Sequence, residues 1–220
     1  REVSIVIIHM YLFMQSRLSF LTGTLAGTLA YSVAAAAGLA FSSAFLSSKA
    51  TASAPAKSPK TRENLLAAFS GESQANQKYL IFAAVAEKEG LPEVAKLFRA
   101  TAKAEALHAA AHLRNAGKVG DTMENLKTAI SGETYEYSEM YPAMTNDASS
   151  EGENRVENYF TWAGMAEKGH AELYQKALDA QGKIAPTEYY ICKVCGYLHE
   201  GPHDGACPIC KMSASAFFKA

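Results

Sequence analysis

Residues 104–109 read Ala-Glu-Ala-Leu-His-Ala, and residues 166–171 read Ala-Glu-Lys-Gly-His-Ala, an offset of 62. A second pattern, E-N-L-x-x-A-x-S-G-E at 63–72, recurs at 124–133, an offset of 61. Because both patterns return in the same order, the chain contains an internal repeat. Each half is predicted to be a helical hairpin with one Glu on its first helix and Glu-x-x-His on its second.

The apolar residues between Thr61 and Gln181 recur at helical spacing, and strand-like alternation is nearly absent. The pattern predicts an all-α four-helix bundle with helices at about 61–89, 91–117, 122–147 and 153–181. Glycine-containing turns separate the segments, and Asp121 or Thr122 is expected to cap the third helix. Pro142 is expected to kink that helix.

Four glutamates interrupt apolar stripes on these helices: Glu72, Glu105, Glu133 and Glu167. A buried carboxylate without compensation costs several kcal/mol, so four would cancel the ~5–15 kcal/mol stability of a typical domain. His108 and His170 each lie one helical turn beyond a Glu, where carboxylate and imidazole can chelate one ion. A Glu from each of two helices with Glu-x-x-His from each of two others is the ligand constellation of di-iron carboxylate sites.

Glu136 follows Glu133 by three residues and adds a fifth carboxylate, whereas the first repeat has Ala75 at that position. Five negative charges nearly balance two divalent cations, and also two trivalent cations with an oxide bridge. Taken alone, a single Glu on a helix is explained by a solvated face, and a single Glu-x-x-His by coincidence. Their paired recurrence favours a redox-active metal site.

The cysteines are Cys192, Cys195, Cys207 and Cys210, in two C-x-x-C pairs separated by eleven residues. Such clustering favours one metal ion over disulfides. Four thiolates suit iron or zinc, and the spacing alone is also that of a structural zinc ribbon.

Residues 71–75 and 132–142, the two Glu-x-x-His motifs, Cys-Gly-Tyr at 195–197 and Cys-Pro-x-Cys at 207–210 resemble the rubrerythrin family. The resemblance covers about residues 61–220. It implies a ferritin-like di-iron domain with a rubredoxin-like domain, and iron in the four-cysteine site. It implies that two irons are held by Glu72, Glu105, His108, Glu133, Glu136, Glu167 and His170.

The same resemblance gives roles to single residues. Glu105 and Glu167 would bridge the irons, and Glu136 and His108 would exchange as ligands of one iron when its oxidation state changes. Tyr79 and Tyr141 match tyrosines that hydrogen-bond near the site in this family. From the sequence alone, packing in an aromatic core explains both tyrosines equally well.

The expected domain order begins with a signal peptide or membrane anchor at 1–52, because Leu18 to Ser48 is uncharged and small residues follow it. The remaining expected parts are a linker at 53–60, the bundle at 61–181, a linker at 182–189 and the rubredoxin-like domain at 190–220. The expected location is therefore exported or membrane-anchored, with the cytoplasm as the alternative.

The expected function is reduction of hydrogen peroxide to water, with electrons passed through the four-cysteine iron from a separate NAD(P)H-dependent reductase. The alternatives are a ferroxidase that detoxifies iron, and a non-enzymatic metal-binding protein with a zinc ribbon. No Gly-rich dinucleotide fingerprint follows a strand, and a net charge of −1 gives no argument for nucleic-acid binding.

The link between the two hairpins, at 117–122, is short for a ferritin-like arrangement. Helices of ~25 residues span roughly 37 Å. Six extended residues reach only about 20 Å. A homodimer in which two chains exchange hairpins is therefore expected.

Overall fold

The computed structural model describes residues 54–220. The predicted leader at 1–52 lies outside the described residues. Among residues 54–220, none of the helices combines the length and apolar character needed to cross a bilayer.

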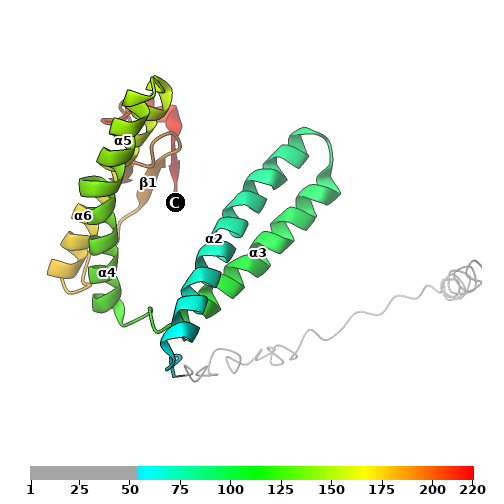
Figure 1. Cartoon of the computed structure of the whole chain (residues 1–220). Coiled ribbons are helices and arrows are strands. Elements are labelled where there is room, and N and C mark those ends of the chain that lie inside the picture. The colour runs from blue at the N-terminus through cyan, green and yellow to red at the C-terminus, as the bar shows by residue number, and fades with distance from the viewer. Residues whose placement is uncertain (1–53) are drawn as a thin grey trace, which may run out of the picture. The chain divides into compact units, whose positions relative to one another are not determined.

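The first hairpin pairs α2 (Pro59–Lys88) with α3 (Pro92–Asn115), which lie side by side in Figure 1. Both helices begin with proline, whose missing N–H is no loss in a first turn. Gly90 makes the turn with a positive φ of 73°, a conformation that costs glycine little. Small residues, including the fully buried Ala95 and Ala102, let the two helices pack closely. α2 thus starts inside the segment predicted to be a linker.

The second hairpin pairs the consecutive helices α4 (Thr122–Tyr135), η2 (Glu136–Met140) and α5 (Tyr141–Ser150) with α6 (Asn154–Asp179). Asp121 caps α4, as predicted, through a reciprocal pair of bonds. The Asp121 carboxylate accepts from the Glu124 amide at 2.9 Å, and the Glu124 carboxylate accepts from the Asp121 amide at 3.0 Å.

At Pro142, where the sequence predicts a kink, the structure has the five-residue π-helix η2 immediately before the proline's helix. The Tyr141 amide donates to the Glu136 carbonyl, one residue farther back than in an α-helix. Pro142 has no N–H to give to the carbonyl of Ser138. The third helix was predicted to end at 147. In the structure it continues to Ser150 and is interrupted by a π-helical turn.

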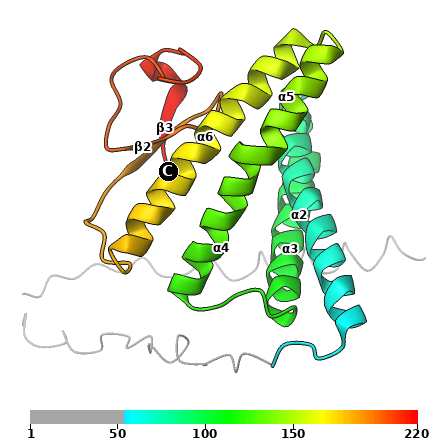
Figure 2. The ribbon, with the colours of Figure 1, turned by 60° about the vertical axis from the view of Figure 1, so that its left-hand side comes forward.

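The C-terminal module is a three-stranded antiparallel sheet of order β2-β1-β3, built from β1 (Tyr189–Cys192), β2 (Leu198–Glu200) and β3 (Phe217–Lys219). A short 3-10 helix, η3 (Ala214–Ala216), precedes β3. Figure 2 shows the module beside α6. Trp162 of α6 packs against the buried cysteines, and Lys176 forms an ion pair with Glu200 at 2.6 Å. The prediction of four helical segments with a small C-terminal metal-knuckle module is confirmed.

Candidate metal centres

The first hairpin brings together Glu72 of α2 with Glu105 and His108 of α3. One potential ligand atom from each residue lies within 4.8 Å of the other two. The His108 Nδ1 atom is 3.1 Å from a Glu105 oxygen, and the His108 side chain is 60% exposed. This trio, here called the first half-site, can supply one ion with two carboxylates and one imidazole.

The second hairpin forms a matching trio, the second half-site, from Glu133 of α4 with Glu167 and His170 of α6. The His170 Nδ1 atom lies 2.6 Å from a Glu167 oxygen and 3.6 Å from a Glu133 oxygen. The His170 side chain is only 23% exposed, so this half-site is more enclosed than the first.

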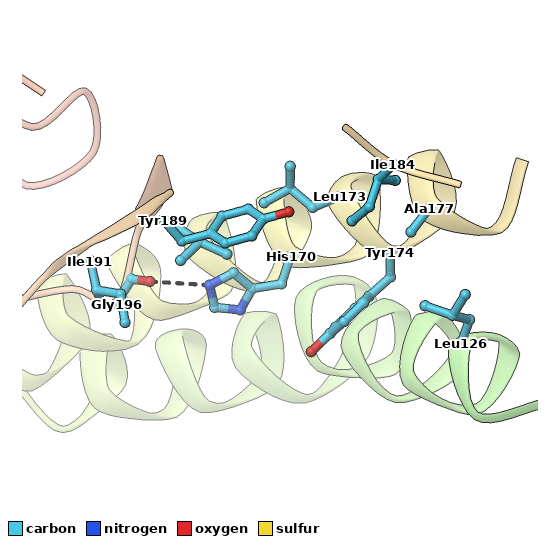
Figure 3. Close-up of a pocket in the computed structure, with 10 residues that line it drawn as sticks. Leu126, His170, Leu173, Tyr174, Ala177, Ile184, Tyr189, Ile191 and Gly196 are labelled. Atoms are coloured by element: carbon cyan, nitrogen blue, oxygen red, sulfur yellow. Dashed lines mark hydrogen bonds between the residues drawn. The ribbon is translucent and has the colours of Figure 1, made fainter. Parts of the chain in front are cut away.

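His170 is oriented by a contact outside the trio. Its Nε2 atom lies 3.1 Å from the carbonyl oxygen of Gly196, as Figure 3 shows. A carbonyl can only accept, so Nε2 carries the hydrogen. In the neutral ring this leaves the Nδ1 lone pair facing the carboxylates, ready for a metal ion. Gly196 follows Cys195, so the same contact joins the second half-site to the four-cysteine module.

In the second half-site, bound protons can reduce the repulsion between neighbouring carboxylates, as a bound cation would. Burial, aided by the hydrogen bond and negative charge of Glu167, raises the pKa of Glu133 to about 7. The hydrogen bond to Glu167 raises the pKa of His170, and the same bond lowers the pKa of Glu167. These shifts have the signs expected for acidic groups crowded in a partly desolvated space. A divalent cation would relieve the same repulsion, so the donor set fits a metal.

Glu136 and Tyr141 lie at the edge of the second half-site. Glu136, on η2, has its pKa raised by burial and by the charge of Glu167. The pKa of Tyr141 is raised by burial and then by Glu167 and Glu136, and its ring centroid lies 6.1 Å from that of Phe160. Both predicted residues are therefore close enough to the trio to interact with its charge.

Tyr79 lies in different surroundings. Its ring centroid is 6.3 Å from that of Phe82 and 6.1 Å from that of Phe98. These contacts form an aromatic cluster between α2 and α3, so the described contacts of Tyr79 are packing contacts. A role for Tyr79 at the irons stays a prediction.

The four cysteines converge in one buried cluster, each at most 8% exposed. The Sγ atoms of Cys192 and Cys210 are 3.6 Å apart, as are those of Cys195 and Cys207. A disulfide requires about 2.05 Å. Four sulfurs about 2.3 Å from a central ion would be separated by about 3.8 Å. The spacing therefore fits a tetrahedral metal site.

The structure thus assembles three groups of the predicted ligands: the first half-site, the second half-site and the four cysteines. The sequence did not indicate two further contacts, those of Gly196 with His170 and of Trp162 with the cysteines. Both arise between segments distant in the chain. The only sequence signal was the position of Gly196 directly after a cysteine ligand.

Helical hairpins with paired Glu and Glu-x-x-His ligands, followed by a four-cysteine module, define a di-iron carboxylate protein with an attached rubredoxin-like domain. The family model "Rubrerythrin" matches residues 63–178, and "Rubrerythrin, rubredoxin-like domain" matches residues 190–218. The chain belongs to the rubrerythrin family. Its carboxylate–histidine residues form the di-iron site of that family, and its cysteines form the rubredoxin-like site.

Several relatives share most of their length with this chain. Nigerythrin of Nitratidesulfovibrio vulgaris is 36% identical over 171 residues, covering 71% of this chain and 85% of nigerythrin. Rubrerythrin-2 of Clostridium acetobutylicum is 36% identical over 174 residues, covering 71% of this chain and 95% of that protein. A solved structure of fully reduced, all-ferrous nigerythrin is 33% identical, covers 76% of this chain and 90% of its own, and has a TM-score of 0.45.

The raised pKa of Glu133 predicts how the metal-free protein responds to pH. A folded-state pKa above the unfolded value means that the native state binds the proton more tightly. This stabilisation is complete below about pH 4.5 and is lost as pH rises through about 7. His170 contributes in the same direction. Denaturant titrations with chelator present should therefore show falling stability between pH 5 and 7.5.

The control for this measurement is Glu133→Gln, which should remove part of the pH dependence. Bound metal should reverse the trend, since metal ligands must be deprotonated. Stability that does not change between pH 5 and 7.5 in the metal-free protein would contradict the charge assignment of the second half-site.

Proposed function

We propose that this chain is a peroxidase that reduces hydrogen peroxide to water at the di-iron site, with electrons supplied through the four-cysteine site. The observation that carries the proposal is the hydrogen bond between His170 Nε2 and the Gly196 carbonyl at 3.1 Å. It connects a ligand of the di-iron site to the residue directly after a cysteine ligand. Such a short, partly buried connection supports electron transfer between the sites.

The reaction consumes one peroxide, two electrons and two protons and yields two water molecules. The iron pair, when bound, supplies the two electrons that break the oxygen–oxygen bond. The protein's own residues hold the irons through carboxylates and imidazoles, and they deliver protons. Glu136 is suited to that second task, because its raised pKa keeps the carboxyl protonated at higher pH than usual. Tyr141 can assist as a neutral hydroxyl donor beside Glu136 and Glu167.

The four-cysteine module is held against α6 by three separate contacts, which supports its role as the electron donor within the chain. The His170–Gly196 bond lies at one point, Trp162 packs on the cysteines at another, and Lys176 pairs with Glu200 at a third. The electrons would come from NAD(P)H through a separate reductase.

The direct test is to reduce the iron-loaded protein without oxygen and to add one equivalent of hydrogen peroxide. We expect rapid formation of the diferric absorption, followed by return of the ferric four-cysteine iron colour as that iron gives its electron to the oxidised di-iron site. In Cys195→Ser, the first oxidation of the reduced di-iron site should persist, while repeated turnover with an external reductase should fall at least tenfold.

Dioxygen is the necessary comparison in that experiment. If air oxidises the reduced protein faster than stoichiometric peroxide does, the peroxidase proposal is wrong and a ferroxidase is favoured. A zinc-filled, colourless cysteine site after native purification would likewise contradict the proposed electron route.

We further propose that the complete di-iron site forms in a dimer, from the first half-site of one chain and the second half-site of another. α3 has 24 residues, or about 36 Å of helix, while the six-residue link from Ala116 to Asp121 reaches only about 20 Å. Both hairpins also expose large apolar side chains, among them Leu97, Leu107 and Met165. A second copy supplies a matching apolar face and the complementary ligands.

Sedimentation of the iron-loaded protein tests this arrangement. A dimer should be found at micromolar concentration, and mixing Glu105→Ala with Glu167→Ala chains should restore one intact di-iron site per exchanged dimer. A monomer that retains two irons in its carboxylate site would overturn the exchange of hairpins. A dimer without complementation would overturn it as well.

A further inference from the structure

Gly164 lies within the 26-residue helix α6, where it faces the first residue of α5. A Cβ atom added to Gly164 would lie 3.0 Å from the Cβ of Tyr141 and 3.6 Å from its Cγ. The nearer atom is bonded directly to the Tyr141 backbone, so no rotamer change moves it away. The two helix backbones are therefore as close here as the absence of a side chain allows.

This close approach lies next to the metal ligands on both helices. Tyr141 directly follows η2, which carries Glu136. Gly164 lies three residues before Glu167, on the same side of α6. We therefore expect a change in backbone separation at Gly164 to shift Glu136, five residues before Tyr141, relative to Glu167.

The repeat gives an internal comparison. At the offset of 62, Tyr141 matches Tyr79 and Gly164 matches Ala102, which is fully buried. The first hairpin thus packs with alanine at this position. The second hairpin contains the π-helix and the extra Glu136, and it has the smaller residue there.

A glycine inside a long helix also has a cost. Glycine is less favourable than alanine in a helix interior. At Gly164 the contact with Tyr141 supplies a structural reason for this loss.

We propose that Gly164 is a positioning residue of the metal site: by allowing the start of α5 to approach α6, it holds Glu136 at the distance from Glu167 that metal binding requires. Its effect on the metal acts through the backbone and needs no contact of its own with the ion. The proposal rests on the di-iron site and not on the identity of the oxidant.

Gly164→Ala is the test variant, and Gly169→Ala is its matched control. Gly169 lies in the same helix, and a Cβ added there would have nothing within 4 Å. In the metal-free full-length protein, Gly169→Ala should raise the melting temperature by about 2–4 °C, through helix propensity alone. Gly164→Ala should give no rise, because the Tyr141 backbone must move by a few tenths of an ångström.

The second readout is Co²⁺ affinity, measured against a competing chelator. The weak visible bands of carboxylate-bound Co²⁺ report the di-metal site, and the intense thiolate charge-transfer bands report the four-cysteine site as an internal reference. Gly164→Ala should weaken the carboxylate site about tenfold, as removal of a ligand-orienting group does. Gly164→Ala should leave the Co²⁺ affinity of the cysteine site unchanged. Gly169→Ala should leave the Co²⁺ affinity of both sites unchanged.

Two outcomes overturn the proposal. If Gly164→Ala stabilises the protein as Gly169→Ala does, the close approach does not constrain the helices. If the Co²⁺ affinity of the carboxylate site is unchanged in Gly164→Ala, whatever the melting temperature, Gly164 serves packing alone. No peroxide is used, so failure of the peroxidase proposal would leave this result intact.

Discussion

The constraint on which the helical part depends is the placement of carboxylates on the inner faces of packed helices. Glu105 and Glu167 have side chains only 17% and 18% exposed, and each lies beside a histidine one turn away. Charged groups this poorly solvated require nearby opposite charge. In the second half-site the pKa values of Glu133 and His170 are both raised, so bound protons meet the requirement in part. A pair of iron ions meets it fully, so folding and metal binding are linked.

The two halves of the repeat have diverged around that constraint. Its offset is 61 up to Glu133 and 62 from Tyr141 onward, so one residue has been added between them. The π-helix Glu136–Met140 occupies this interval and accommodates the addition without ending the helix. The added residue, the extra carboxylate of Glu136 and the glycine at 164 all belong to the second hairpin. The asymmetry of the metal site therefore combines a side-chain difference, Glu136 against Ala75, with a change in the backbone.

Much of this could be predicted from sequence, because the deciding patterns are local. Helical periodicity, the Glu-x-x-His motifs, the cap at Asp121 and the four cysteines each span a few residues. The π-helix was not predicted, although the change in repeat offset contained the necessary information.

The bond from His170 to Gly196 could not be predicted, since it depends on how the C-terminal module packs on α6. The same reason applies to Tyr79: sequence position places it near Glu72, and only the packed hairpin shows its contacts with Phe82 and Phe98. Contacts between segments distant in the chain set the surroundings of both residues. Local pattern does not encode them.

The most direct measurement is the melting temperature of the full-length protein with and without ferrous iron, without oxygen, at pH 7. If the inward-facing carboxylates require cations, the iron-loaded protein should melt well above the metal-free protein, and Glu105→Gln with Glu167→Gln should reduce this difference in melting temperature by weakening iron binding. Equal melting temperatures with and without iron would contradict the account.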